Sequence, residues 1–194
     1  MRRYEVCPSC GFTKLKNEFY LSADAEKKRY LLHTNSREDA GYVQWLSAFL
    51  HKARLLELTP DACILDFGSG PQPVLASLLQ ERGYKVSIYD QFFAPDPIVL
   101  RCSYSVIVLH EVIEHLADPR ECLAALLEAL APHGYFAIRT QFRPPTDTDF
   151  DAFWYRKDLT HRSFFTKLSF ATLAQQLGLA MSQPATDIVL LQKQ

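Results

Sequence analysis

The chain has 194 residues, of which 48% are hydrophobic and 22% are charged, and its 21 Lys and Arg against 22 Asp and Glu give a formal net charge of -1. This composition excludes a disordered chain, because there is enough apolar surface for a core, and it offers no electrostatic case for tight nonspecific nucleic-acid binding. No apolar run approaches the roughly 18 residues of a membrane span, and the first residues lack the apolar stretch of a secretion signal. The 5 cysteines are an odd number, which fits reduced thiols better than a set of disulfides. We therefore expect a reduced, cytoplasmic protein.

Residues 1–59 are expected to form a separate N-terminal segment. They begin with Cys7-Pro8-Ser9-Cys10-Gly11, a tight turn that presents two thiols in the form of half a zinc knuckle. A closed structural zinc site needs four ligands, and the sequence contains no second Cys-x-x-Cys pair. We therefore expect a metal-free turn, with zinc on Cys7 and Cys10 as the alternative, including a site shared between two chains.

A helical cap is predicted for the rest of this segment. Residues 22–29 have mixed charge, which is typical of a solvated helix. Residues 36–58 place apolar side chains three and four positions apart, the spacing of one helix face. Thr59-Pro60 then ends the helical pattern.

From residue 60 onward, short apolar runs alternate with helical patterns, which predicts a mostly parallel sheet covered by helices. The expected strands are residues 63–67, 85–90, 98–100, 105–109, 135–138, 179–182 and 187–191. The expected helices are residues 71–83, 118–131 and 166–177. Residues 60–194 are therefore predicted to form one α/β domain.

A glycine turn, Gly68-Ser69-Gly70, joins the first of these strands to the helix that follows. Glycine suits such a turn because a side chain would block the approach of the backbone to a nucleotide-like ligand. Asp90, which ends the next strand, is placed to accept hydrogen bonds from both hydroxyls of a ribose. Asp66 is placed to receive the ammonium of an amino-acid-like ligand. An aminoacyl group together with a ribose describes S-adenosylmethionine.

Two motifs carry a family resemblance. Residues 65–71 (Leu-Asp-Phe-Gly-Ser-Gly-Pro) resemble the first motif of class I S-adenosylmethionine-dependent methyltransferases, and residues 111–116 (Glu-Val-Ile-Glu-His-Leu) resemble a segment of many small-molecule members. The resemblance covers residues 60–194 and implies a Rossmann-like sheet of seven mostly parallel strands, the last antiparallel. It also implies the residues of the cofactor site: Asp66, Gly68, Ser69, Gly70, Asp90, Gln91, Phe92 and His110.

Departures from the family pattern leave two alternatives open. Gln72 stands where a third glycine is usual, and Ser105 stands where an aspartate commonly opens the fourth strand. Both departures permit a binding or regulatory module that keeps the fold without turnover. The other alternative is a nicotinamide-dependent oxidoreductase, against which Pro73 occupies the third glycine position of a dinucleotide fingerprint.

Glu111, Glu114 and His115 are spaced to share one side of a helical turn at the carboxyl end of a strand. With His161 they would make a metal site, a layout that resembles that of metal-dependent RNA 2′-hydroxyl methyltransferases. The alternative, which we favour, is that the carboxylates balance the positive end of a helix dipole and no metal binds. His161 is separately a candidate general base, because an imidazole titrates near neutral pH, and Glu111 is the second candidate catalytic residue.

The methyl acceptor is expected to be a small molecule. A near-neutral charge and an aromatic stretch over residues 150–155 favour a small acceptor over a long nucleic acid. In class I methyltransferases an N-terminal helical segment often shapes the acceptor pocket, which makes Tyr30 and His33 candidate acceptor contacts. Trp154 and Tyr155 are the candidates from the aromatic stretch.

Overall fold

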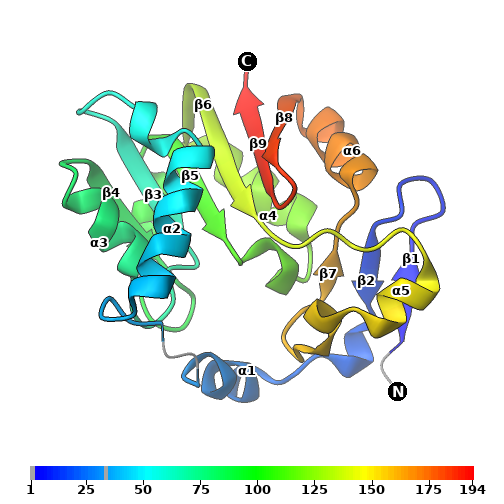
Figure 1. The fold of residues 1–194 in the computed structure, drawn as a ribbon. Coiled ribbons are helices and arrows are strands. Elements are labelled where there is room, and N and C mark those ends of the chain that lie inside the picture. The colour runs from blue at the N-terminus through cyan, green and yellow to red at the C-terminus, as the bar shows by residue number, and fades with distance from the viewer. Residues whose placement is uncertain (1–2, 33–34) are drawn as a thin grey trace.

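A six-stranded sheet forms the centre of the computed structural model, which describes residues 3–32 and 35–194 (Figure 1). Its strands lie in the order β4 (Lys85–Tyr89), β3 (Cys63–Phe67), β5 (Tyr104–His110), β6 (Leu130–Arg139), β9 (Ile188–Lys193) and β8 (Leu179–Ala185). The first four strands are parallel, and β9 runs antiparallel to both of its neighbours. The predicted α/β fold with an antiparallel last strand is thereby confirmed.

The strand expected over residues 98–100 is wrong, and the sheet has six strands in place of seven. These residues lie in the 3-10 helix η3 (Pro97–Arg101), which begins after Asp96. The Asp96 carboxylate accepts a hydrogen bond from the backbone N–H of Ile98 at 2.9 Å, and Pro97 has no N–H to give to a sheet. An N-capped turn therefore replaces the outer strand, and β4 becomes the edge of the sheet.

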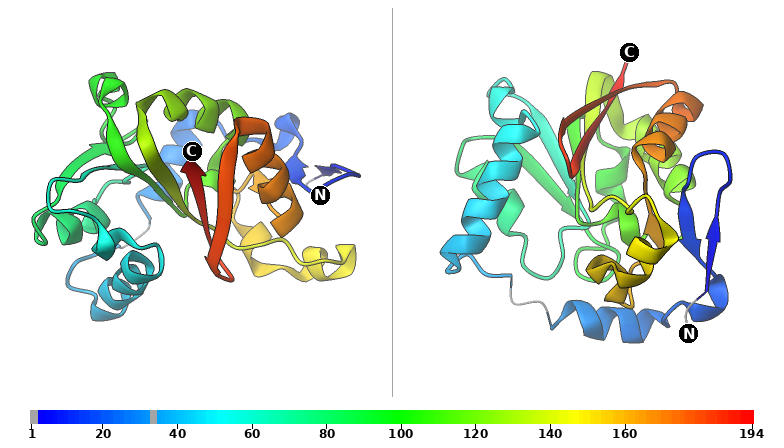
Figure 2. Two further views of the ribbon diagram at one scale, coloured as in Figure 1. Left: turned by 90° about the horizontal axis from the view of Figure 1, so that it is seen from above. Right: turned by 45° about the vertical axis from the view of Figure 1, so that its right-hand side comes forward.

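Helices cover both faces of the sheet (Figure 2). On one face, α4 (Pro119–Leu126) and α6 (Lys167–Leu177) contribute to the larger apolar cluster, which includes Ile107 and Leu109 of β5. On the other face, α2 (Ala40–Lys52) and α3 (Val74–Gln80) pack in a second cluster with Val106 and Val108. Because side chains alternate along a strand, the unbroken apolar run of β5 supplies both clusters.

The N-terminal segment contains the two expected helices, α1 (Ala23–Tyr30) and α2 (Ala40–Lys52), but it begins with a β-hairpin that the sequence did not predict. β1 (Tyr4–Val6) and β2 (Thr13–Leu15) form an antiparallel hairpin, and β2 also pairs with β7 (Ser163–Phe164). Thr13 and Leu15 are fully buried on either side of the less buried Lys14, which is the alternation of a strand. Three residues are too few for this period to stand out in the sequence.

α1 (Ala23–Tyr30) follows the hairpin and is held against residues 158–162 by ion pairs. The Arg162 guanidinium donates to the Glu26 carboxylate at 2.5 Å, and Glu26 is buried. Arg29 Nε donates to Asp158 Oδ1 at 2.9 Å. These contacts place one face of α1 next to the segment that contains His161. No helix in the two described ranges has the length and apolar character to cross a bilayer.

Cys7 and Cys10 lie in the turn of the hairpin. Gly11, with a φ of 72°, donates its N–H to the carbonyl oxygen of Cys7 at 2.9 Å and closes this turn. Hydrogen bonds from Ser9, whose hydroxyl lies 3.1 Å from Cys7 Sγ, lower the pKa of the Cys7 thiol to about 7. Among residues 3–32 and 35–194, no group of three or more metal-ligating side chains includes either cysteine.

Candidate active site

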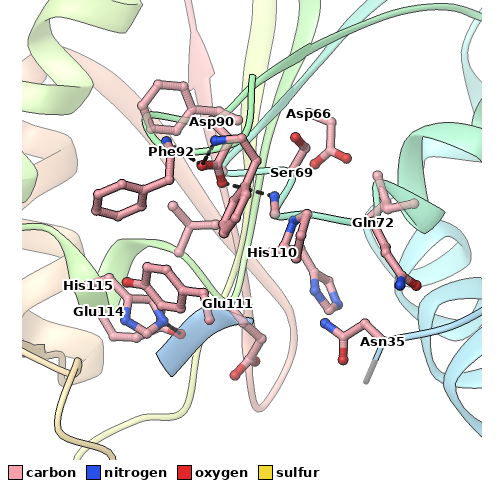
Figure 3. Close-up of a pocket in the computed structure, with 18 of the residues that line it drawn as sticks. Asn35, Asp66, Ser69, Gln72, Asp90, Phe92, His110, Glu111, Glu114 and His115 are labelled. Atoms are coloured by element: carbon pink, nitrogen blue, oxygen red, sulfur yellow. Dashed lines mark hydrogen bonds and ion pairs between the residues drawn. The ribbon is translucent and has the colours of Figure 1, made fainter. Parts of the chain in front are cut away.

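A cavity of about 710 Å³ opens beyond the carboxyl ends of β3, β4 and β5 (Figure 3). Parallel sheets bind their ligands at this edge, because the loops that follow neighbouring strands converge there. α1, α2 and the segment before β7 supply the remaining walls. The cavity is lined by these residues that the sequence singles out: Tyr30, Asp66, Gly68, Ser69, Gly70, Asp90, Gln91, Phe92, His110, Glu111, Glu114, His115, Trp154, Tyr155 and His161.

The glycine turn adopts the backbone conformation that makes glycine necessary. Gly68 and Gly70 have φ values of 79° and 69°, in the left-handed region. A Cβ on Gly68 would lie 2.6 Å from Val112 Cγ2, so this position also lacks room for a side chain. A Cβ on Gly70 would meet no atom within 4 Å. The turn therefore presents bare backbone to the cavity at Gly70.

Asp90 is tied to the glycine turn. Its Oδ2 accepts a hydrogen bond from the backbone N–H of Gly70 at 3.0 Å. Its Oδ1 accepts hydrogen bonds from the backbone N–H groups of Phe92 and Phe93, at 2.8 and 3.1 Å. Each carboxylate oxygen has more than one acceptor position, so Asp90 retains capacity for hydroxyl donors of a ligand.

Asp66 lies within β3 at the wall of the cavity and is 4% exposed. Burial is the main cause that raises the pKa of this carboxyl to about 7; a hydrogen bond from the Ala76 backbone opposes the shift, and the nearby charge of Asp90 adds to it. A bound ammonium group would lower the pKa again, because an opposite charge favours the ionised carboxylate. Asp66 is therefore suited to a positively charged ligand group.

His110, the last residue of β5, lies between two aromatic side chains of α2. Its ring makes edge-to-face contacts with Trp45 and Phe49, at centroid distances of 4.4 and 4.7 Å. Burial lowers the pKa of His110 to about 3, and the charge of Arg139 adds to this effect. The imidazole is thus neutral, and its buried Nε2 has no hydrogen-bond partner among the described residues.

Glu111 and Glu114 are joined through the phenol of Tyr155. Its hydroxyl lies 2.9 Å from Glu111 Oε2 and also contacts Glu114 Oε1 and the Thr140 hydroxyl. Only residues 113–115 form a helical turn, and Glu111 precedes it with a left-handed φ of 56°. The expected shared helical turn is therefore wrong, because the backbone reverses at Glu111, yet both carboxylates meet at Tyr155.

Burial changes the protonation of these carboxyls. Glu114 is fully buried, which raises its pKa to about 8, with the charge of Glu111 as the next cause. Burial also raises the pKa of Glu111, while Tyr155 and Arg139 oppose the shift. Arg139 lies 3.5 Å from Glu111 Oε1 and also pairs with Asp187 at 2.5 Å. One carboxyl of the pair is thus set to hold a proton near neutral pH.

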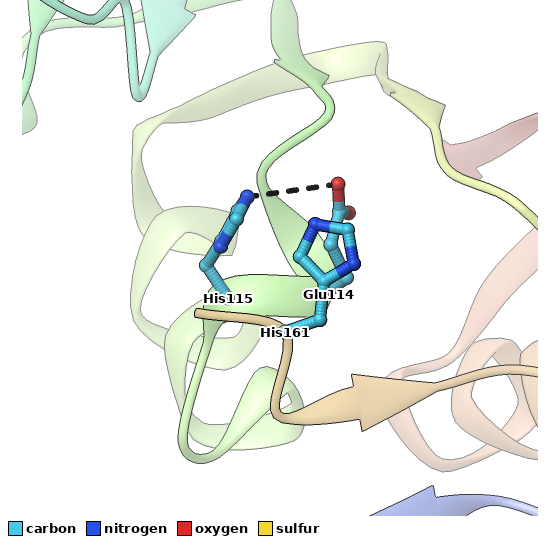
Figure 4. A group of neighbouring side chains, drawn as sticks. All are labelled: Glu114, His115 and His161. Carbon is cyan, nitrogen blue, oxygen red and sulfur yellow. Dashed lines mark ion pairs between the residues drawn. The ribbon is translucent and has the colours of Figure 1, made fainter. Parts of the chain in front are cut away.

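His115 and His161 lie beside Glu114 (Figure 4). Their ring centroids are 4.7 Å apart, and His115 Nε2 lies 3.8 Å from Glu114 Oε1. His161 Nδ1 contacts the backbone oxygen of Tyr155 at 2.7 Å, and His115 Nδ1 contacts that of Thr160 at 3.3 Å. Burial, followed by the neighbouring His161, lowers the pKa of His115 to about 3.

The candidate acceptor contacts differ in their surroundings. The Tyr30 hydroxyl donates to Glu26 at 2.8 Å, and its ring packs edge-to-face against His115. Tyr155 is buried beneath the cavity, whereas Trp154 is 63% exposed at its rim. His33 lies outside the described residues. Cys7 and Cys10 are in the distant hairpin turn and do not line the cavity.

Sequence reasoning missed several residues of the cavity wall. Tyr42 and Trp45 of α2 line it, although their spacing identified them only as the apolar face of a helix. Asn35 and Gln72 also line the cavity, as Figure 3 shows. Trp45, a large aromatic residue on the predicted helix before the glycine turn, is the one sequence signal that could have identified this wall.

Comparisons with known proteins agree with this fold. A family model described as a methyltransferase domain matches residues 38–183. Among solved structures, 1,6-didemethyltoxoflavin-N1-methyltransferase of Burkholderia thailandensis is similar at a TM-score of 0.55 and 13% identity, over 98% of this chain and 96% of that chain. Magnesium protoporphyrin IX methyltransferase of Synechocystis PCC 6803 has a TM-score of 0.55 and 9% identity, over 91% of this chain and 97% of that chain.

A third similar structure is CalO1, a methyltransferase in calicheamicin biosynthesis, with a TM-score of 0.54 and 17% identity, over 89% of this chain and 58% of that chain. All three of these structures contain S-adenosylhomocysteine. A search of curated protein sequences finds no match. From the match over residues 38–183 and the observed sheet, we conclude that the chain belongs to the methyltransferase domain family and has the class I methyltransferase fold that its motifs predicted.

Proposed function

We propose that the protein is an S-adenosylmethionine-dependent methyltransferase that acts on an oxygen, nitrogen or carbon atom of a small molecule. The observation that carries this proposal is the joined geometry of the glycine turn and Asp90, with Asp66 beside them in one cavity. The glycine turn offers backbone without side chains, Asp90 offers a carboxylate for hydroxyl groups, and Asp66 offers a buried carboxyl for an ammonium group. These are the three recognition features that S-adenosylmethionine requires.

In this proposal each part of the cofactor meets a separate part of the cavity. Asp66 receives the ammonium of the methionine moiety, and the turn over Gly68, Ser69 and Gly70 approaches its backbone. Asp90 accepts hydrogen bonds from the ribose hydroxyls, and Gln91 and Phe92 flank the adenine. His110 closes the methionine end as a neutral, buried ring. S-adenosylmethionine supplies the reactive methyl group, so the protein supplies binding and alignment.

The acceptor is proposed to bind between α1 and the residues that follow β5. Tyr30, Trp154 and Tyr155 line this part of the cavity, and His33 belongs to the same candidate set. A volume of about 710 Å³ suits a cofactor and a compact acceptor, within the range of ordinary small-molecule sites. The similar enzyme from Burkholderia thailandensis was solved with 1,6-didemethyltoxoflavin, a small molecule, which supports an acceptor of this class.

Glu111 and His161 are the proposed catalytic residues. Glu111 lines the cavity and holds only partly satisfied oxygens, since its Oε1 has no hydrogen-bond partner among the described residues. His161 is held through Nδ1, which lies 2.7 Å from the Tyr155 carbonyl oxygen, and its ring lines the cavity. Either group is suited to accept a proton from an attacking hydroxyl or amine. We place this reaction in the cytoplasm, where all five cysteines remain free thiols.

Calorimetric titration with S-adenosylmethionine tests the proposal, with NADH titrated in parallel. We expect saturable binding of one S-adenosylmethionine per chain and a rise in melting temperature, since a ligand that binds only the folded state stabilises it. Failure to bind S-adenosylmethionine would overturn the proposal. Transfer of a labelled methyl group to members of a metabolite panel then separates an enzyme from a module that binds the cofactor without turnover.

A further inference from the structure

Glu114, His115 and His161 bring one carboxylate and two imidazoles together at the wall of the cavity. One potential ligand atom of each lies within 4.8 Å of those of the other two. We propose that these three residues bind a divalent transition-metal ion, with Mn²⁺ and Zn²⁺ the best suited to this donor set. Metal–ligand bonds of about 2.0–2.2 Å place the donors of a tetrahedral site about 3.4 Å apart, so a bound ion would draw these side chains closer together.

The two imidazoles are already held in the orientation that a metal ligand needs. Nδ1 of His161 lies 2.7 Å from the carbonyl oxygen of Tyr155, and Nδ1 of His115 lies 3.3 Å from that of Thr160. Donation from Nδ1–H to a carbonyl fixes the tautomer in which Nε2 carries the lone pair. Backbone carbonyls hold metal-binding histidines in this way in known sites.

Glu114 has a buried oxygen that lacks a hydrogen bond. Its Oε1 is taken by Tyr155, whereas its Oε2 has no hydrogen-bond partner among the described residues, although the side chain is fully buried. An unsatisfied buried oxygen is costly, and a cation would satisfy it. Tyr155 would then act as the group that orients the carboxylate toward the ion.

Glu111 is not part of this donor set, so the site differs from the four-ligand layout that the sequence suggests. Its carboxylate turns toward Tyr155 and Arg139, and the cluster of potential ligands does not include it. Two imidazoles and one carboxylate are softer than the all-oxygen shell that Mg²⁺ favours. We therefore expect Mn²⁺ or Zn²⁺ to bind more tightly than Mg²⁺.

Three protein ligands leave coordination positions open toward the cavity, which all three residues line. A hydroxyl that binds a divalent ion loses its proton more readily, because the ion stabilises the oxyanion. Resting on the proposed methyl transfer, this assigns an acceptor with a hydroxyl group that coordinates the ion. Metal binding by these three residues does not require methyl transfer. A failed metal titration and a failed S-adenosylmethionine titration can therefore be told apart.

Titration of the chelator-treated full chain with Mn²⁺, followed by electron paramagnetic resonance, tests the site. Mn²⁺ prefers oxygen and nitrogen ligands, so it avoids the thiols of Cys7 and Cys10. Zn²⁺ is titrated in a variant that carries Cys7→Ser and Cys10→Ser. We expect one ion per chain, with nitrogen couplings from two imidazoles in the spin-echo spectrum of bound Mn²⁺. Glu114→Gln, His115→Ala and His161→Ala should each weaken binding at least tenfold.

Two controls keep the test specific. His51→Ala removes an exposed histidine from the end of α2 and should leave metal affinity unchanged. S-adenosylhomocysteine binding and thermal melting show whether each variant is folded, and Glu114→Gln keeps the shape of the side chain. The proposal is overturned if the wild type shows no saturable binding, if bound Mn²⁺ shows no nitrogen coupling, or if folded Glu114→Gln retains full affinity.

Discussion

The carboxylate of Asp90 accepts a hydrogen bond from the backbone N–H of Gly70 across 3.0 Å and so fixes the glycine turn to the end of β4. Asp90→Asn removes the charge from this contact and from the two N–H groups that follow it. Hydrogen bonds to a charged group are worth about 1.5–3 kcal/mol each, so we expect the free energy of unfolding to fall by about that amount and cofactor affinity to fall at least tenfold. Urea unfolding and calorimetry measure the two effects.

The exposed Asp24 of α1 provides the matched control for this change, since Asp24→Asn removes the same charge away from the cavity. Because Asp24 lies in the first turn of α1, this change should lower stability by less than about 1 kcal/mol and leave cofactor affinity unchanged. Equal cofactor affinity in Asp90→Asn and wild type would contradict the assignment of Asp90 to the ribose.

Gly68 and Gly70 offer a pair of substitutions that separate stability from binding. Gly70→Ala adds left-handed strain of about 1–2 kcal/mol but meets no neighbouring atom. Gly68→Ala adds the same strain together with a clash against Val112, so its loss of stability should be larger by about 1–3 kcal/mol. Both variants should bind the cofactor poorly, and Gly70→Ala should do so while folded. Thermal melting with parallel calorimetry gives the comparison, and equal destabilisation by both variants would refute it.

Asp66 should make the stability of the protein depend on pH. Its pKa is about 7 in the folded chain and near its ordinary value of 3.8 in the unfolded chain. As pH rises from about 4 to about 7, the unfolded state loses a proton that the folded state keeps, so stability falls, on the order of a few kcal/mol. Asp66→Asn removes this contribution. The difference in unfolding free energy between variant and wild type should therefore grow in favour of the variant over this interval, and a constant difference would contradict the raised pKa.

Cofactor binding should release a proton from the same residue. Between about pH 5.5 and pH 7 the free chain holds Asp66 protonated, while a bound ammonium favours its ionised form. Affinity for S-adenosylmethionine should thus increase with pH in this range. Calorimetry in two buffers of different ionisation enthalpy measures the proton release, and it should disappear in Asp66→Asn. Proton release that persists in this variant would point to another group.

Tyr155→Phe removes the hydroxyl that Glu111 and Glu114 share. Buried carboxyl oxygens would lose their donor, so we expect a loss of about 1–3 kcal/mol in unfolding free energy and a lower rate of methyl transfer. The neighbouring Trp154→Phe is the control, because Trp154 is largely exposed and its replacement should change stability by less than about 0.5 kcal/mol. Chemical denaturation of both variants measures the contrast, and similar losses in the two would argue against the shared contact.

The sequence predicted that the glycine turn and Asp90 lie together, but it did not predict the contact of Tyr155 with Glu111 and Glu114, for a physical reason. The turn at Gly68 and the carboxylate of Asp90 follow neighbouring strands of one parallel sheet, so strand order alone brings them together. Tyr155 reaches Glu111 and Glu114 from 44 and 41 residues away, through a segment without regular period. Nothing local in the sequence encodes that contact.

The one incorrect element and the hairpin that the sequence missed have the same cause, which is their short length. Residues 98–100 are apolar enough for a strand, but Pro97 and the cap at Asp96 favour a 3-10 turn. The hairpin strands Tyr4–Val6 and Thr13–Leu15 have three residues each, and β2 is buried through its pairing with distant β7. Short runs do not distinguish a strand from a turn when the deciding partner is far away in the sequence.

Because β2 pairs with β7, the part of the chain that must fold together extends beyond residues 38–183, which the family model matches. A chain that begins at residue 38, where the family match begins, would lose the hairpin, α1 and Glu26. The edge of β7 would then be open to pairing with other molecules, and the charge of Arg162 would lose its buried counter-ion. Such a fragment should aggregate, although it retains every motif by which the family is recognised.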